Sequence, residues 1–239
     1  MYSIAVATKK GGAGKSTLIA HLATALAELG ERPLILDCDT AISSLYIWGK
    51  AGRAGVAEPE ILKADAETIE GQLKAAAERA LRWVFIDVPA GGGDLVARAA
   101  SLAHLVLIPV RASSFDLAAT KQTIDMLKRT VDDTEPIELA CRTALGKAAI
   151  VLNGIPANPS RRWRADIESA LGQCGAGGLD IVGALGERAA YRTSLERGRG
   201  VAEEGRSKPA IDEIHALLRK IKARAAARAE ALRRMAVSS

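Results

Sequence analysis

Residues 8–17 have the sequence TKKGGAGKST, between an apolar run at residues 4–7 and a helical pattern that continues from Leu18. A strand, a glycine-rich turn and a helix N-terminus in this order form an anion site. The glycines let backbone N–H groups point inward, and the helix start adds partial positive charge. Lys15 can reach the outer phosphates of a nucleotide there, and the hydroxyl of Ser16 can bind Mg²⁺. The stretch therefore predicts a phosphate-binding loop; a glycine-rich turn with two chance lysines is the alternative.

The loop departs from the general pattern GxxxxGK[ST] at its front edge. That pattern requires a glycine at position 9, where this chain has Lys9, and a second lysine, Lys10, follows it. A lysine five residues before Lys15 cannot easily fold back onto its own phosphates. It is better placed to reach the nucleotide of another subunit.

Residues 10–17 resemble the deviant Walker A motif of the ParA/MinD ATPases, cytosolic proteins that position DNA, division proteins or other cargo. The resemblance implies that Lys10 is the signature lysine, which reaches across an ATP-dependent sandwich dimer and acts in catalysis together with Lys15. The implied cofactors are ATP and Mg²⁺. The residues that would contact the nucleotide in this motif are Lys10, Gly11, Gly12, Ala13, Gly14, Lys15, Ser16 and Thr17.

Two carboxylates follow the next apolar run, at residues 33–36. Asp37 and Asp39 stand at the end of this predicted strand, on the sheet edge that also carries the glycine loop. Two carboxylates at this place can hold metal-bound water or orient an attacking water, although an isolated Asp-x-Asp is equally a helix cap. The family resemblance assigns Asp39 to positioning the lytic water and Asp37 to the Mg²⁺ surroundings. The family usually continues with Pro-Gln, but this chain has Thr40 and Ala41, which leaves the rate of hydrolysis open.

Two further strand ends complete the predicted site. Asp87 follows the apolar residues 83–86, as in a Walker B strand, where the carboxylate supports Mg²⁺ through water. The metal-associated set is therefore Ser16, Asp37, Asp39 and Asp87. Asn153 ends the predicted strand 148–153 and resembles the family's adenine-reading residue, with a plain turn asparagine before Gly154 as the alternative.

The rest of the chain alternates apolar runs with amphipathic stretches. Hydrophobic residues make up 49% of the 239 residues and aromatic residues only 3%, so the core consists of Ala, Leu, Ile and Val. We predict one α/β domain over residues 1–239, a P-loop NTPase with a doubly wound, mostly parallel sheet flanked by helices. Residues 42–55 are expected to form a loop or short helix over the site. Further strands are predicted at residues 105–110 and 181–185, and helices at residues 15–29, 67–82, 95–103, 115–129 and 161–171.

Several classes of protein are disfavoured by the composition. No uncharged apolar stretch approaches the roughly 18 residues that a membrane span needs, and we expect no signal peptide because the chain starts with a strand. We also expect no operator-specific DNA binding, since no helix-turn-helix precedes that strand. Three widely spaced cysteines (Cys38, Cys141 and Cys174) without a CxxC pair fit a reducing cytosol and predict neither disulfides nor a zinc site.

Positive charge is concentrated at the C-terminus. Residues 183–239 hold 13 Lys/Arg and 7 Asp/Glu, although the whole chain carries a net charge of only +5. This points to a polyanion or to a solubilising basic helix, predicted at about residues 210–235. The region resembles the C-terminal part of small, ParF-type ParA proteins, whose basic residues bind DNA without sequence preference. The candidate DNA contacts are Arg188, Arg192, Arg197, Arg219, Lys220, Lys222 and Arg224. A membrane-surface helix fits poorly because the last turns are rich in Ala.

The resemblance thus implies a ParA-type ATPase that closes as a dimer on Mg²⁺-ATP, coats DNA and is released by hydrolysis. It would hydrolyse ATP slowly without a ParB-like partner, segregate a plasmid, a chromosome or another cargo, and reside in the cytoplasm on the nucleoid. We keep three alternatives: an ATP-gated assembly protein of the T-DNA-border type, a protein- or carboxysome-positioning ATPase, and a metabolic or metal-insertase ATPase. The absence of a CxxC pair argues against the metal-insertase version.

Overall fold

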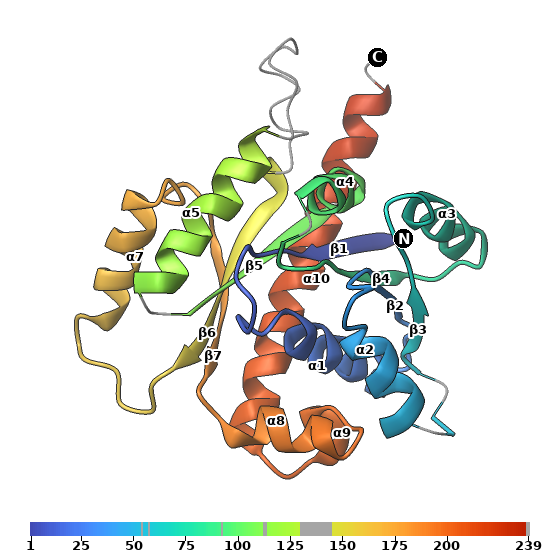
Figure 1. Cartoon of the computed structure of the whole chain (residues 1–239), viewed down its shortest axis with the longest axis horizontal. Helices are drawn as coiled ribbons and strands as arrows, with labels where there is room; N and C mark the ends of the chain where they lie inside the picture. Colours follow the sequence, from blue (N-terminus) through green and yellow to red (C-terminus); the bar gives the residue numbers. More distant parts are fainter. Residues whose placement is uncertain (54, 57, 92, 112–113, 130–144, 238–239) are drawn as a thin grey trace.

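A seven-stranded sheet with helices on both faces forms the body of the molecule (Figure 1). The computed structural model describes residues 1–53, 55–56, 58–91, 93–111, 114–129 and 145–237. The strands are β1 (Tyr2–Val6), β2 (Leu34–Asp37), β3 (Glu60–Lys63), β4 (Trp83–Asp87), β5 (Leu105–Arg111), β6 (Ala148–Ile155) and β7 (Ile181–Gly186). Their order is β3-β2-β4-β1-β5-β6-β7, and every neighbouring pair is parallel. The predicted single-domain, doubly wound α/β fold is confirmed.

Helices connect the strands and cover them. They are α1 (Lys15–Glu28), α2 (Ser44–Ile47), the π-helical turn η1 (Trp48–Gly52), α3 (Ile69–Glu78), α4 (Gly93–Leu102), α5 (Ser114–Arg129), the 3₁₀ turn η2 (Leu145–Lys147), α7 (Trp163–Gln173), α8 (Ala189–Glu196), α9 (Val201–Glu204) and α10 (Lys208–Val237). Among the described helices, none combines the length and the apolar character that crossing a membrane requires.

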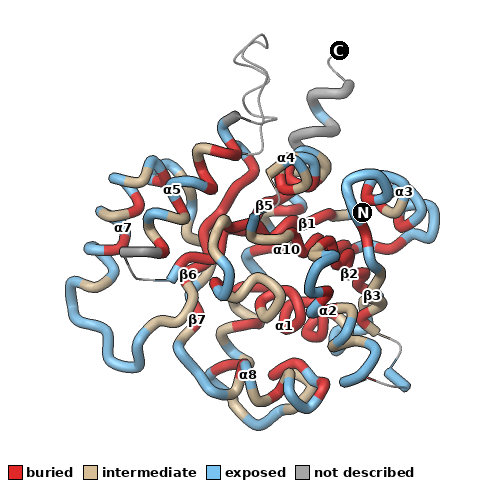
Figure 2. The backbone as a smooth tube through the Cα atoms, in the orientation of Figure 1, coloured by how far each residue is buried: buried red, intermediate tan, exposed pale blue. Residues whose placement is uncertain are grey.

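The strands separate two hydrophobic cores, because successive side chains of a strand point to opposite faces. In β1, Ile4 and Val6 join a core with α1, α8 and α10, whereas Ala5 joins a core with α3, α4, α5 and α7. The central strands are buried on both sides (Figure 2), as expected for parallel strands between two layers of helices. The long helix α10 crosses the sheet on the α1 side (Figure 1).

The parallel arrangement brings the predicted site together. The glycine loop follows β1, Asp37 ends β2 and Asp87 ends β4, and these three strands run side by side in the order β2-β4-β1. In the sheet register Asp37 lies opposite Asp87, and Asn153 lies opposite Arg111, the last residue of β5. Strand β6 continues two residues past Asn153, beyond its predicted end. All of these residues are therefore at the carboxyl edge, where open α/β sheets bind ligands.

Three features differ from the sequence-based expectations. The edge strand β3 was not predicted, because its residues are half-buried or exposed and give no apolar run. Helices α8 and α9 were not predicted either. Helix α3 ends at Glu78 and is therefore shorter than the expected 67–82. Cys38 and Cys174 are free, and Cys141 lies outside the described residues.

Candidate nucleotide-binding site

The glycine loop has the backbone that an inward-facing turn requires. Gly12 and Gly14 have φ angles of +75° and +92°, in the left-handed region that glycine tolerates best. Asn153 holds the loop from β6: its Nδ2 donates a 2.9 Å hydrogen bond to the carbonyl oxygen of Ala13. A Cβ on Gly14 would lie 2.3 Å from that nitrogen, so only glycine permits this approach. Asn153 is thus placed beside the loop, where it both fixes the turn and lines the adjoining cavity.

Ser16 and Asp87 meet at the start of α1. The Ser16 hydroxyl donates a 2.5 Å hydrogen bond to Oδ2 of Asp87, which is 1% exposed. Burial raises the pKa of Asp87 to about 7, although the bond from Ser16 opposes this shift. Burial also lowers the pKa of Lys15, and the nearby carboxylates of Asp87 and Asp39 oppose that shift. Lysine, hydroxyl and carboxylates therefore share one small, partly desolvated region.

These residues fit a Mg²⁺-nucleotide. Oδ1 of Asp87 is buried and has no hydrogen-bond partner among the described residues, so a polar atom is left for a metal-bound water. Nowhere in the described chain do three His, Cys, Asp or Glu side chains gather as a self-sufficient metal site. This is consistent with Mg²⁺, which binds through one or two protein groups together with substrate phosphates.

Asp37 and Asp39 have different surroundings. Asp37 is fully buried, and its two carboxylate oxygens accept hydrogen bonds from the backbone N–H groups of Asp39 (3.1 Å) and Tyr46 (2.9 Å). Burial raises the pKa of Asp37, and these N–H donors oppose the shift. Asp37 therefore holds the segment that leads into α2, and its place near Mg²⁺ stays a prediction. Asp39 is half-buried, and its Oδ1 accepts a 3.3 Å hydrogen bond from the backbone of Ile42.

The Lys10 side chain contacts a distant helix of the same chain. Its ammonium nitrogen lies 2.8 Å from Oδ2 of Asp116, near the start of α5. The sequence did not single out Asp116 as a site residue. The available signal was a carboxylate a few residues beyond the end of β5, at the same carboxyl edge of the sheet.

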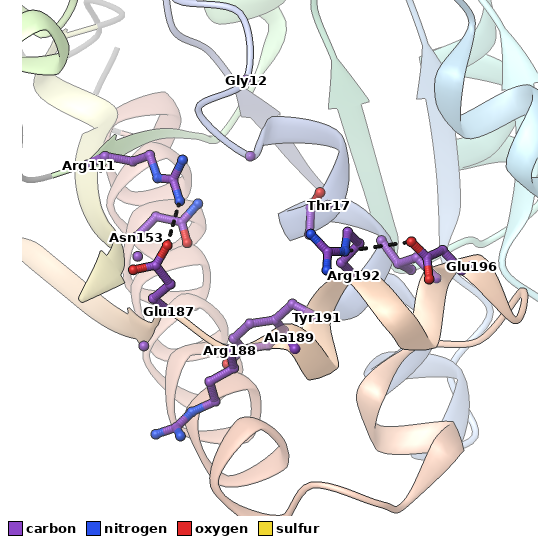
Figure 3. Close-up of a pocket in the computed structure, with 14 residues that line it drawn as sticks. Gly12, Thr17, Arg111, Asn153, Glu187, Arg188, Ala189, Tyr191, Arg192 and Glu196 are labelled. Atoms are coloured by element: carbon purple, nitrogen blue, oxygen red, sulfur yellow. Dashed lines mark ion pairs between the residues drawn. The ribbon is translucent and has the colours of Figure 1, made fainter. Parts of the chain in front are cut away.

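A cavity of about 650 Å³ adjoins the loop (Figure 3). Arg111, Asn153 and Glu187 lie on one side, with Arg111 and Glu187 3.9 Å apart as an ion pair, and Arg192 and Glu196 of α8 lie on the other. The sequence did not predict Arg111 and Glu187 as residues of the site, because surface ion pairs leave no pattern in the sequence. Thr17 also lines the cavity, which is large enough for a nucleoside.

The seven basic residues predicted to contact DNA do not form one surface. Arg188, Arg192 and Arg197 lie on or beside α8 at the carboxyl edge, where Arg188 pairs with Glu213 and points away from the cavity (Figure 3). Lys222 and Arg224 lie near the opposite edge of the sheet. Lys222 pairs with Glu31 (3.6 Å) and Arg224 with Asp180, while Arg197 pairs with Glu204. Arg219 and Lys220 are exposed on α10, and Arg192 is 78% exposed, so these three present the most accessible charge.

Comparison with known proteins agrees with this geometry. Residues 4–201 match the family of the CobQ/CobB/MinD/ParA nucleotide binding domain. The chain is 35% identical over 127 residues to Protein ParA of Rhizobium radiobacter, a match that covers 52% of this chain and 55% of that protein. It is 26% identical over 223 residues to Maintenance of carboxysome distribution protein A of Halothiobacillus neapolitanus, covering 92% and 96% of the two chains.

Solved structures resemble the fold over most of its length. A chain of the MinC:MinD cell division protein complex of Aquifex aeolicus superposes with a TM-score of 0.71 at 19% identity, covering 93% of this chain and 96% of that one. The ATP complex of McdA from Cyanothece gives a TM-score of 0.70 at 16% identity, with the same coverage. Because the family match spans most of the chain and includes the glycine loop, the chain belongs to the CobQ/CobB/MinD/ParA family of nucleotide-binding domains.

Proposed function

We propose that this chain is a ParA-type ATPase that binds DNA in an ATP-dependent manner and positions a cargo. The observation that carries the proposal is the Ser16–Asp87 contact beside Lys15, at the sheet edge where Asp39 also lies. These groups are what hydrolysis of a Mg²⁺-nucleotide requires, because phosphoryl transfer depends on positioning and charge stabilisation.

Each residue has a defined part in this reaction. Residues 11–14 present backbone N–H groups to the phosphates, and Lys15 and Lys10 stabilise the negative charge that develops on them. Ser16 would hold Mg²⁺ through its hydroxyl oxygen, and Asp87 would support the ion through the carboxylate oxygen that has no partner among the described residues. Mg²⁺ supplies neutralisation of the phosphate charge. Asp39 orients the attacking water, and Asn153 reads the base at the mouth of the cavity.

The position of Lys10 supports a proposal of dimerisation. Within one chain the ammonium group is held by Asp116 and not by the glycine loop. We propose that ATP binding draws Lys10 from Asp116 toward the phosphates of a second copy, so that the nucleotides are enclosed between two protomers. Hydrolysis would reverse the closure, and a ParB-like partner protein would accelerate it.

The DNA-binding surface is proposed on helix α8 and the exposed face of α10. Among the seven predicted DNA contacts, Arg192, Arg219 and Lys220 are the most accessible, and phosphate contacts need no base-specific geometry. A location in the cytoplasm on the nucleoid follows from this proposal.

A second candidate is a protein-positioning ATPase. It is favoured by the match to the carboxysome distribution protein, which extends over 92% of this chain, whereas the match to the ParA protein extends over 52%. Both candidates share the ATPase cycle and differ in the cargo.

The proposal is tested by DNA binding of the wild type and of Lys10→Ala with ADP, with ATP and without nucleotide. Two unrelated DNA sequences and a salt series complete the design. We expect binding that requires ATP and Lys10, ignores sequence and weakens steeply with salt. Binding that is equal with ADP and ATP, or absent in all conditions, contradicts the DNA-binding part of the proposal.

A further inference from the structure

Arg53, just after η1, is buried against the C-terminal third of the chain. Its Nη1 donates to the carbonyl oxygen of Gly198 (2.9 Å) and to Oε2 of Glu203 (2.8 Å), and its Nη2 donates to Oε1 of Glu203 (2.7 Å) and to the carbonyl oxygen of Glu58. The Arg53 side chain is only 2% exposed. A bidentate pair of this kind fixes both distance and orientation.

Trp48 and Gly52 extend the same contact. The indole Nε1 of Trp48 donates a 3.0 Å hydrogen bond to the carbonyl oxygen of Leu195, and the guanidinium of Arg53 lies 5.1 Å from the centre of the indole ring. Gly198 has a φ angle of +70°, and a Cβ on it would lie 1.6 Å from the carbonyl oxygen of Gly52. We call the contacts of Trp48, Gly52 and Arg53 with residues 195–203 the clamp.

One side of the clamp is continuous with the candidate catalytic carboxylates. The chain runs from Asp39 directly into α2 and η1, and Asp37 anchors α2 by accepting the backbone N–H of Tyr46. A displacement of Asp39 would therefore act on a segment whose far end is Arg53.

The other side of the clamp is the end of α8. Leu195 and Gly198 belong to the last turn and the C-terminal cap of this helix, where a cation is favourable because carbonyl groups face outward. Helix α8 lines the nucleotide cavity and carries Arg192, one of the accessible charges proposed for DNA. Glu203 also accepts the backbone N–H of Gly200 (2.7 Å), so the clamp fixes the turn between α8 and α9.

The segment between Asp39 and Arg53 has features that are typical of an element with a second conformation. Ser43, immediately before α2, has a φ angle of +51°, and its buried hydroxyl oxygen has no hydrogen-bond partner in the described structure. The turn η1 is π-helical. Left-handed non-glycine residues and π-turns both occur preferentially at functional sites, where strain is balanced by surrounding contacts.

We propose that Arg53 and Trp48 are positioning residues that transmit the nucleotide state at Asp39 to helix α8, and through it to Arg192. The inference rests on the proposed ATP-dependent DNA binding, since it names how that binding is regulated. Because Arg53 is buried, it cannot itself be a phosphate contact. We therefore expect substitution of Arg53 to change how DNA affinity responds to the nucleotide. The number of DNA phosphate contacts should stay the same, and so should the dependence of DNA affinity on salt.

The variants are Arg53→Lys, which keeps the charge but not the fork, and Trp48→Phe, which removes one donor and keeps an aromatic ring. Arg79→Lys is the matched control, because Arg79 makes a comparable two-pronged pair with Glu60 on the exposed surface. The first readout is the DNA affinity measured with a non-hydrolysable ATP analogue, divided by the DNA affinity measured with ADP. The affinity for a fluorescent ADP derivative is measured in parallel. We expect ADP affinity to stay within about twofold and the ratio to fall by about fivefold or more, the lower end of allosteric couplings.

The second readout, hydrogen exchange, does not depend on DNA. In the wild type we expect the exchange of residues 44–52 and of residues 194–204 to differ between the ATP analogue and ADP. In both variants the difference should persist in residues 44–52 and disappear from residues 194–204. A retained affinity ratio, or a retained exchange difference in residues 194–204, overturns the clamp. If the wild-type protein binds no DNA but shows both exchange differences, the proposed DNA-binding function is contradicted and the clamp is not.

Discussion

Nζ of Lys10 lies 2.8 Å from Oδ2 of Asp116, so the lysine at the front of the glycine loop is held by α5 of its own chain. The Asp116 side chain is only 5% exposed, whereas the Lys10 side chain is 36% exposed and can leave toward solvent. The contact is therefore reversible without unfolding the loop. Under the proposed function, this contact would separate nucleotide binding by Lys15 and the loop backbone from the later step that uses Lys10.

Lys10→Ala should retain nucleotide binding and lose hydrolysis. Since Lys10 is directed away from the loop, we expect ADP affinity within a few-fold of the wild type. The hydrolysis rate should fall by about 10²–10³, as for the removal of one preorganised donor to transition-state charge. ADP titration and single-turnover ATP hydrolysis measure the two effects. Lys9→Ala is the matched control, and an equal loss in both variants would contradict a specific role for Lys10.

Asp87→Asn should remove the effect of Mg²⁺ on nucleotide affinity. Oδ2 of Asp87 accepts the hydroxyl of Ser16, and the second oxygen has no partner in the described structure, so this carboxylate is the group expected to orient the metal through water. Supporting groups of this kind are worth about 10–100-fold in metal affinity. ADP titrations with Mg²⁺ and with EDTA should differ for the wild type and converge for Asp87→Asn. Asp94→Asn, an exposed acid in the first turn of α4, should behave as the wild type.

The sequence predicted the parts of this site that depend on local pattern. The glycine loop, the strand ends with Asp37 and Asp87, and the parallel sheet all follow from apolar runs and their terminal residues. The contact of Lys10 with Asp116 joins residues 106 positions apart, and the clamp joins positions 53 and 203. Such pairings depend on how helices pack on the sheet, which no local pattern encodes. The same reason explains why the basic residues of α8 and α10 lie at two edges of the sheet.

His21 should make the stability of the fold depend on pH. Its Nδ1 accepts the backbone N–H of Val201 (3.2 Å) and its Nε2 lies 3.0 Å from the carbonyl oxygen of Tyr191, so the buried ring is neutral and joins α1 to α8 and α9. Burial lowers its pKa to about 4, although the Tyr191 carbonyl and the nearby Glu203 oppose the shift. The stabilisation is fully present above the unfolded pKa of 6.5 and is lost as pH falls through the folded pKa.

The size of this effect follows from the same shift. A fall from 6.5 to about 4 corresponds to about 3 kcal/mol, which should be lost between pH 7 and pH 4. Urea unfolding of the wild type and His21→Gln at several pH values measures it. We expect the variant to be less stable than the wild type at pH 7, and the difference in free energy of unfolding between the two proteins to narrow by about 2–3 kcal/mol toward pH 4. Parallel profiles would show that His21 does not titrate in this range.

Arg192→Glu should weaken DNA binding more than an equivalent change elsewhere. Arg192 is 78% exposed and pairs with Glu196 one turn along α8, while Arg164 is 74% exposed and pairs with Glu168 on α7 in the same spacing. The two substitutions therefore match in charge, exposure and helix context. We expect Arg192→Glu to reduce the salt slope of DNA binding by about 1, with Arg164→Glu unchanged. Equal slopes would place the DNA surface away from α8.

Gly198→Ala should destabilise the fold far more than Gly205→Ala, although both glycines have nearly the same φ angle (+70° and +72°). A Cβ on Gly205 meets nothing within 4 Å, so that substitution costs only the left-handed backbone strain, about 1–2 kcal/mol. A Cβ on Gly198 would lie 1.6 Å from the carbonyl oxygen of Gly52, so the same strain is joined by forced separation of η1 from α8. Overpacking of this kind adds about 1–3 kcal/mol. Urea unfolding of the two variants measures the difference, and equal losses would mean that the two segments are not held in contact in solution.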